Sequence, residues 1–312
     1  MRISEETKGV YIISATPFAD SGALDLDSTD SLVDFYLGCG VDGMTILGVM
    51  GEAPKLTAEE SVTFLTRVLK RVDGRAGVIV GVSNPGLDNL ARLAHTAMEQ
   101  GAAGVMVAPF AGLNIEAKVL GYYDQVCKAL GPDVPLVYQD YPQTTGVPVS
   151  VQTLNTLIDR HPQFVMLKHE DCPGLAKISA LRQSAEREGR RRVSILVGNG
   201  GLYYPQELAR GVDGAMTGFA YPEMLVQVYK LHAAGRHDAA EDLFDAYLPL
   251  VRHEQQPGIG LALRKEVLKR RGAIASAKIR APGPSLTPED QAELTRMIDR
   301  VEMRLSTLGK AA

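Results

Sequence analysis

The feature that most constrains the fold of this chain is a short apolar segment, rich in β-branched residues, that occurs eight times before residue 218. Helix-like stretches fill most of the intervals of about 20 to 35 residues between these segments. Strands that are apolar on both faces and alternate with helices are typical of a parallel sheet covered on both sides. The expected strands are Val10–Ser14, Met44–Leu47, Val78–Val82, Val105–Ala108, Leu136–Gln139, Phe164–Lys168, Val193–Val197 and Ala215–Thr217.

The intervals between these strands support a closed barrel. Three of them end in the same joint, Gly40-Val41-Asp42-Gly43, Gly101-Ala102-Ala103-Gly104 and Gly211-Val212-Asp213-Gly214, in which one glycine suits the end of a helix and the next opens a strand. Eight such units in about 220 residues fit a (β/α)8 TIM barrel better than an open sheet. Helical spacing of apolar residues predicts helices over Ser61–Val72, Asn89–Gln100, Ile115–Leu130, Val149–Arg160 and Gly174–Arg187.

The strand pattern stops after Tyr221-Pro222, and the rest of the chain favours helices. We therefore expect two parts, a barrel with the active site over residues 1–222 and a C-terminal helical domain over residues 223–312. The helices of the second part are expected at Met224–Ala234, Asp238–Arg252, Gly260–Arg271 and Pro288–Leu305.

Composition excludes several classes of function. The 312 residues carry a net charge of −4, which argues against nucleic acid or an anionic membrane as a partner. No apolar run is long enough for a signal peptide or a membrane helix, so we expect a soluble cytoplasmic protein. Cys39, Cys127 and Cys172 lack disulfide or zinc spacing, and the histidines lack metal-ligand spacing. We expect no metal and no cofactor.

Active sites of such barrels lie at the carboxyl ends of the strands, and Lys168 ends the sixth expected strand. Lysine is seldom buried without a reason. One interpretation makes its amine a nucleophile toward a carbonyl carbon. The other makes it a strand-end residue that pairs with Glu170 or Asp171 at the rim. His169 should point the opposite way from Lys168, which favours a structural or rim position.

Two glycine-rich turns raise similar alternatives. Gly48-Val49-Met50-Gly51 follows the second strand, and its backbone N–H groups either hold a carboxylate or only turn the chain. Gly198-Asn199-Gly200-Gly201 follows the seventh strand, where some barrels bind phosphate. A phosphate-binding barrel isomerase is the hypothesis that this second turn would support.

Four motifs lie along the chain in a fixed order: Ala15-Thr16-Pro17-Phe18, Gly48-x-x-Gly51-Glu52 with Leu56-Thr57-x-x-Glu60, Pro142-x-x-Thr145-Gly146 and Leu167-Lys168. In these motifs the chain resembles the dihydrodipicolinate synthase/N-acetylneuraminate lyase family of class I aldolases and dehydratases. The resemblance implies a barrel with a C-terminal helical domain, usually a homotetramer, and a Schiff base between Lys168 and the keto carbon of pyruvate or a related 2-keto acid.

The chain departs from that family at residues that handle substrate and protons. Val49 and Met50 replace the hydroxyl residues of the family's carboxylate-binding turn. The family's proton-relay tyrosine aligns with Gln139 without a gap, or with Tyr138 if one residue is inserted. Thr144 replaces the arginine of true dihydrodipicolinate synthases, so we do not expect that activity.

We therefore predict a Schiff-base lyase that cleaves or dehydrates pyruvate or a related 2-keto acid, with an aldehyde as a further partner. Lys168 is the nucleophile, the turn from Gly48 to Gly51, with Val49 and Met50, binds substrate, and Gln139 or Tyr138 handles protons. Tyr141 and His169 are further candidates for proton transfer. A homo-oligomer, tetramer or dimer, is expected. The alternative is a non-catalytic keto-acid-binding or regulatory homologue.

Overall fold

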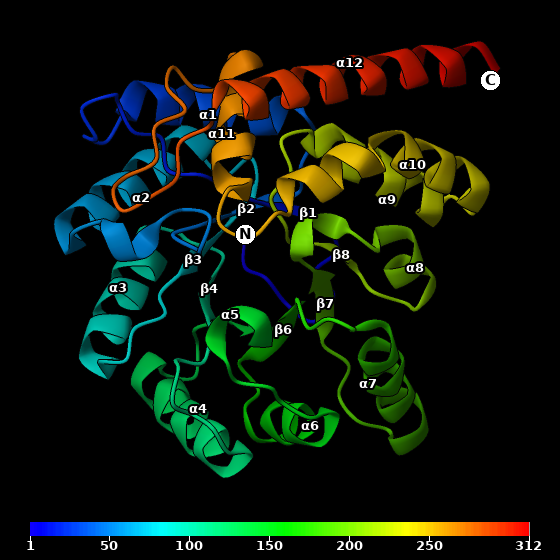
Figure 1. The fold of residues 1–312 in the computed structure, drawn as a ribbon. Coiled ribbons are helices and arrows are strands. Elements are labelled where there is room, and N and C mark those ends of the chain that lie inside the picture. The colour runs from blue at the N-terminus through cyan, green and yellow to red at the C-terminus, as the bar shows by residue number, and fades with distance from the viewer. Residues whose placement is uncertain (312) are drawn as a thin grey trace.

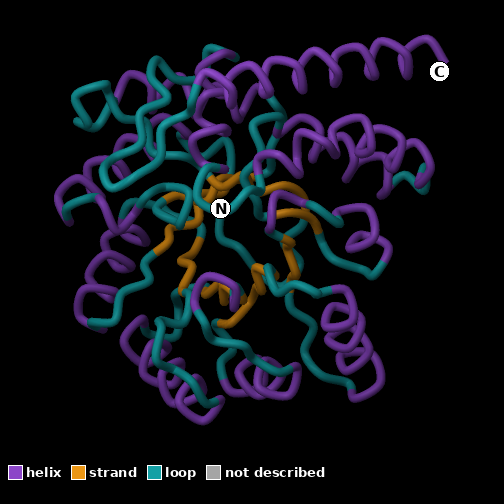
Figure 2. The backbone as a smooth tube through the Cα atoms, viewed as in Figure 1, coloured by secondary structure: helices purple, strands orange, loops and turns teal. Residues whose placement is uncertain are grey.

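Eight parallel strands close into one barrel, in which each strand pairs with the next in sequence and β8 pairs with β1. The computed structural model describes the backbone of residues 1–311 and the side chains of residues 1–308. The predicted (β/α)8 barrel with a C-terminal helical region is confirmed, and Figure 2 shows the strands at its centre inside a ring of helices. The strands are β1 Gly9–Ile13, β2 Gly43–Ile46, β3 Gly77–Gly81, β4 Gly104–Val107, β5 Leu136–Asp140, β6 Phe164–His169, β7 Ser194–Val197 and β8 Gly214–Ala215.

The helices follow the strands in alternation. Three of them within the barrel region, α1, α5 and α8, lie where no helix was predicted from apolar spacing. The helices are α1 Leu26–Gly38, α2 Ala58–Val72, α3 Leu87–Glu99, α4 Glu116–Leu130, α5 Pro142–Thr145, α6 Val151–Arg160, α7 Leu175–Glu188, α8 Tyr204–Ala209, α9 Pro222–Ala233, α10 His237–Glu254, α11 Gly260–Arg270 and α12 Pro288–Ala311, with single turns at Ala53–Lys55 (η1) and Asn199–Gly201 (η2).

Element ends differ from the expected ones for local reasons. Helix α2 begins at Ala58, three residues before the apolar spacing starts, because Thr57 and Glu60 form a reciprocal capping box. Strand β8 is shorter than expected, although backbone hydrogen bonds continue past it: Met216 donates to Val197 and Ile13 donates to Thr217.

The barrel interior is a packed core that is separate from the larger core between strands and helices. The ring of Tyr11 fills one side of it, and a Cβ at Gly43 would lie only 2.2 Å from that ring. This close approach requires glycine at residue 43. The interior residues are Ile3, Tyr11, Ile13, Ile79, Ala103, Met106, Val137, Val165, Met166, Leu196 and Met216.

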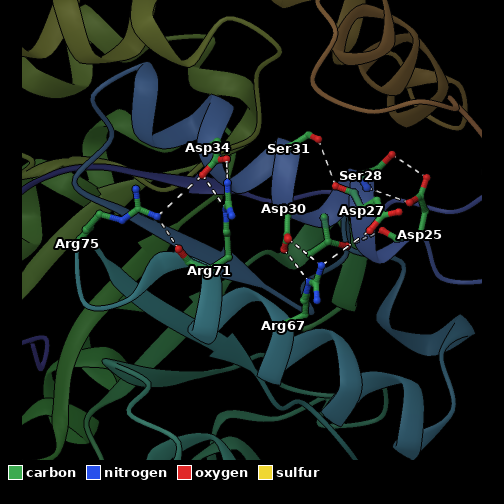
Figure 3. Close-up of polar contacts among 10 residues, drawn as sticks. Asp25, Asp27, Ser28, Asp30, Ser31, Asp34, Arg67, Arg71 and Arg75 are labelled. Carbon is green, nitrogen blue, oxygen red and sulfur yellow. Dashed lines mark hydrogen bonds and ion pairs between the residues drawn. The ribbon is translucent and has the colours of Figure 1, made fainter.

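Ion pairs connect α1 and α2 on the outside of the barrel. Arg67 makes a bidentate contact with Asp30, with both N–O distances at 2.7 Å, and one turn further along Arg71 pairs with Asp34. Figure 3 shows these pairs side by side along the two helices. They explain why α1, which carries several aspartates, packs stably against α2.

The C-terminal helices lie against one side of the barrel. Helix α9 packs on β1 and so completes the ring of barrel helices, and α12 runs along α10 (Figure 1). The division at residue 222 remains a prediction. Within residues 1–311, no helix is long and apolar enough to span a bilayer.

Candidate active site

Two polar side chains converge on one carboxylate oxygen of a third at the mouth of the barrel. The register of β5 and β6 places Gln139 beside Lys168, and both side chains face inward. Lys168 Nζ lies 2.9 Å from Glu170 Oε2, and Gln139 Nε2 donates a 2.7 Å hydrogen bond to the same oxygen. The Lys168 and Glu170 side chains are only 6% and 8% exposed. A buried amine thus lies against a buried carboxylate that a neutral amide holds in place.

Sequence reasoning considered Glu170 only as a partner for a lysine at the rim. The ion pair with Lys168 exists, but it is buried. Glu170 can lie here because residue 198, at the end of β7, is glycine: a Cβ there would be 2.2 Å from Glu170 Cγ. Glu170 lies two residues after Lys168, and alternate residues of a strand face the same side. This spacing is the signal that could have identified Glu170.

Tyr138 faces away from Lys168 into the core between the barrel and its helices. Its ring packs between those of Tyr123 and Phe164, with centroids 4.8 and 5.7 Å away. Its hydroxyl is buried and has no hydrogen-bond partner among the described residues. Burial raises the pKa of Tyr138 well above its usual value, so this hydroxyl holds its proton.

His169 also faces outward, as its neighbouring position to Lys168 predicted. Its Nδ1 lies 3.4 Å from Asp140 Oδ2, and Lys177 Nζ lies 2.7 Å from the same carboxylate. This buried cluster lies on the far side of β5 and β6 from Lys168. Tyr141 directly precedes α5 as its N-cap.

The turn from Gly48 to Gly51 has free donors. None of the N–H groups of residues 49–51 donates a hydrogen bond within residues 1–308. Thr16 Oγ1 fixes the turn by donating a 2.7 Å hydrogen bond to the carbonyl of Gly51. Val49 is exposed, whereas Met50 packs on the barrel interior. The turn can therefore present backbone donors to an anion.

Beside the turn is a cavity of about 940 Å³. Its wall brings together Gly48, Val49, Gln139 and Thr144, so the predicted turn and the proton-handling candidate face one space. Lys168 adjoins this wall at Gln139 through the β5–β6 pairing. The space can hold a small organic acid.

The C-terminal region contacts Glu52, the residue that directly follows the turn from Gly48 to Gly51. The side chain of Glu52 is buried, and its Oε1 lies 2.6 Å from Nζ of Lys265, which is itself fully buried on α11. Lys55 Nζ lies 2.9 Å from the other oxygen and is a quarter exposed. Helix α11 and the turn are therefore joined by a desolvated ion pair.

Replacing Lys265 with methionine is expected to lower the free energy of unfolding by about 2–3 kcal/mol, because Glu52 would lose its buried partner. Lys55→Met is the matched control on the same carboxylate, and should cost less than about 1 kcal/mol because Lys55 is partly solvated. Urea unfolding of both variants measures the difference. Equal losses of unfolding free energy in the two variants would contradict a larger contribution from the buried pair of Glu52 and Lys265.

The second glycine-rich turn, Gly198 to Gly201, is filled by protein side chains. Glu170 occupies the space over Gly198, and a Cβ at Gly200 would lie 2.1 Å from Gln255. Asn199 Nδ2 donates a 2.7 Å hydrogen bond to the backbone carbonyl of Glu170. The turn thus supports Glu170 and leaves little room for a phosphate. Among the described residues, no three His, Cys, Asp or Glu side chains form a group suited to a metal ion.

Comparisons with known proteins agree with this geometry. The L-2-keto-3-deoxyarabonate dehydratase of Azospirillum brasilense is 31% identical over 95% of this chain and 94% of its own. A crystal structure of dihydrodipicolinate synthase from Rhodopseudomonas palustris is 46% identical, with a TM-score of 0.94 over 96% of this chain and 99% of the other. The 4-hydroxy-tetrahydrodipicolinate synthase of Kineococcus radiotolerans is 28% identical over 89% of this chain and 88% of its own. The model of the dihydrodipicolinate synthetase family matches residues 6–301, and the chain belongs to that family.

Proposed function

We propose that this protein is an enzyme that dehydrates a short 2-keto-3-deoxy acid through a Schiff base on Lys168. The observation that carries the proposal is the buried contact of Lys168 with Glu170, with Gln139 on the same carboxylate oxygen. The similarity to a 2-keto-3-deoxy acid dehydratase supports dehydration over the other reactions of the family. Thr144, which carries no charge, supports a substrate with one carboxylate rather than two.

The first step is formation of the imine. Glu170 Oε2, 2.9 Å from Lys168 Nζ, accepts a proton from the ammonium group and frees its lone pair. The amine then attacks the C2 carbonyl carbon and forms a carbinolamine. Glu170 returns a proton to the C2 hydroxyl, which leaves as water, and a protonated imine remains.

The second step is elimination. The protonated imine withdraws electrons from C3, so a C3–H bond breaks, its proton goes to the Glu170 carboxylate and an enamine forms. The enamine electrons then expel the C4 hydroxyl, which takes this proton from Glu170 and leaves as water. Hydrolysis of the conjugated imine releases the product and Lys168. The net change is the loss of one water molecule.

The remaining site residues bind and orient. The free N–H groups of residues 49–51 hold the C1 carboxylate, and Gln139 fixes Glu170 by its 2.7 Å hydrogen bond. Gln139 has no titratable proton near neutral pH, so its role is to position Glu170. Tyr138, turned into the outer core, takes no part in this scheme.

Replacement of Gln139 with alanine is expected to lower kcat about 10-fold, because Glu170 loses the amide that orients it. Replacement of Tyr138 with phenylalanine should leave kcat within about twofold, since its hydroxyl has no hydrogen-bond partner in the described part of the chain. Steady-state rates and urea unfolding of the two variants provide the comparison. A larger loss of activity in Tyr138→Phe would overturn the assigned roles.

Trapping with borohydride tests the proposed function. The protein is incubated with pyruvate, reduced and digested, and the peptide masses are measured. We expect a stable adduct on Lys168, because reduction converts the imine to a secondary amine. Absence of an adduct with pyruvate and with longer 2-keto acids would refute Schiff-base chemistry.

Product analysis then distinguishes dehydration from aldol cleavage. With a 2-keto-3-deoxy pentonic or hexonic acid, dehydration keeps every carbon atom in one product, whereas aldol cleavage releases pyruvate and an aldehyde. Formation of pyruvate would replace the dehydratase proposal with an aldolase. An adduct without turnover of any such acid would instead indicate a homologue that only binds.

A further inference from the structure

Arg264 is a buried arginine of the C-terminal region, and its side chain lies at the mouth of the barrel. It comes from α11, and its side chain is 7% exposed. A Cβ at Gly218, just beyond β8, would lie 3.1 Å from Arg264 Nη1 and 1.9 Å from the Met50 sulfur. The guanidinium and the Met50 thioether therefore lie together over the end of β8, where glycine leaves room for them.

The nitrogens of Arg264 are not equally satisfied. Nε donates a 2.9 Å hydrogen bond to Glu254 Oε2. With the Gln255 amide turned to satisfy its neighbours, its oxygen accepts from Arg264 Nη2 at 3.1 Å and from the Gly200 N–H at 3.0 Å. For Nη1, the only acceptor among the described residues is the Met50 sulfur, 2.6 Å away. A thioether is a weak acceptor, so a strong charged donor is left without an oxygen partner.

The position of this donor fits the substrate of the proposed reaction. Glu170 lies over Gly198 at the end of β7, and Arg264 lies over Gly218 beyond β8, the neighbouring strand. Neighbouring strands are about 5 Å apart, close to the extended length from C2 to the terminal hydroxyl oxygen of a five-carbon acid. A 2-keto acid attached through C2 to Lys168 on β6 would extend its far end past Glu170 toward Arg264.

Helix α11 reaches the wall of the cavity. Leu261, one turn before Arg264 on α11, lines the 940 Å³ cavity, and the Met50 sulfur lies against Arg264 Nη1. Methionine is unbranched and adapts readily to a new neighbour. A different rotamer of Met50 would therefore take the sulfur away from Nη1.

We infer that Arg264 Nη1 binds a hydroxyl group at the far end of the substrate, in the place that the Met50 sulfur occupies in this structure. Arg264 thereby selects hydroxylated 2-keto acids over unsubstituted ones. The buried carboxylate of Glu254 already pairs with Arg264, so the site favours a neutral hydroxyl over a second carboxylate. This inference rests on the proposed function.

The test uses a matched pair of ligands and borohydride trapping. One ligand is a five-carbon 2-keto-3-deoxy acid with its terminal hydroxyl, and the other is pyruvate, which cannot reach Arg264. In Arg264→Lys, which keeps a charge for Glu254, the half-saturating concentration of the hydroxylated acid should rise about 10-fold. That of pyruvate should stay within twofold.

Met50→Leu provides an independent measurement, since it keeps the side-chain volume and removes the sulfur acceptor. The ratio of the half-saturating concentration of the hydroxylated acid to that of pyruvate should fall two- to fivefold, because any effect on the turn that binds the carboxylate of both ligands cancels in this ratio. This variant also tests the inference if Arg264→Lys does not fold.

The outcomes separate the two proposals. If the wild-type protein traps both ligands but the substitutions change both equally, or change neither, the role of Arg264 is overturned and the Schiff base stands. If the wild-type protein traps no 2-keto acid, the proposed function fails and the role of Arg264 fails with it.

Discussion

Lys168→Ala is expected to lower kcat at least ~10³-fold while the protein keeps its fold. The amine is the only group in the inward-facing cluster that can form a covalent bond to the keto carbon, because its neighbours there are a carboxylate and an amide. Circular dichroism checks the fold, and steady-state turnover of a 2-keto-3-deoxy acid measures the loss. Borohydride should no longer fix pyruvate to the protein.

Lys177 offers a matched control for this substitution. It too is a buried lysine paired with a carboxylate, 2.7 Å from Asp140, but it lies outside the barrel. Lys177→Ala should lower stability and leave both the adduct and kcat within a few-fold of wild type. Activity near the wild-type level in Lys168→Ala, or loss of the adduct in Lys177→Ala, would rule out the assignment of Lys168.

Much of the fold could be predicted because the pattern that encodes it is local. A strand that is buried on both faces must be apolar throughout, and all eight runs show this in the sequence. Helix α1 was not predicted because its buried face begins with the polar residues Ser28 and Thr29, which weaken the apolar periodicity. Arginines on α2 pair with its aspartates, and short-range spacing does not reveal such a partner.

The candidate site was predictable only in part. Lys168 could be identified because a charged residue at the end of an apolar strand is unusual. The choice between Tyr138 and Gln139 depended on strand register, since adjacent residues face opposite sides. In the structure, Gln139 pairs with Lys168 and faces the same side of the sheet, whereas Tyr138 faces the opposite side.

Arg264 could not be identified as a site residue from local pattern, and for Glu170 the spacing from Lys168 indicates only the face of the strand and not that the side chain is buried. An acid just after a strand, or an arginine on a helix, is usually solvated. Glu170 is buried because Gly198, 28 residues later, leaves space for its side chain, and Arg264 is buried because Glu254 pairs with it. Both depend on contacts between distant segments.

Glu170→Gln is expected to lower kcat about 10³-fold while the Lys168 adduct with pyruvate still forms on long incubation. Glutamine has nearly the same shape and can keep the contact with Gln139, but it cannot accept the C3 proton or deliver it to the C4 hydroxyl. Because Glu170 also transfers protons during imine formation, the adduct should form slowly, whereas elimination should be lost. Rates of product formation, measured beside the yield of trapped adduct, show which step is lost.

Asp140→Asn is the matched control, because Asp140 is equally buried and lies next to Gln139 on β5, yet it faces outward toward Lys177 and His169. It should affect stability and leave kcat within about threefold. If Glu170→Gln lowers kcat less than tenfold, another group must carry the proton. A water molecule held by Gln139 at the cavity wall would then be the remaining carrier near Lys168, and Gln139→Ala would become the more damaging substitution.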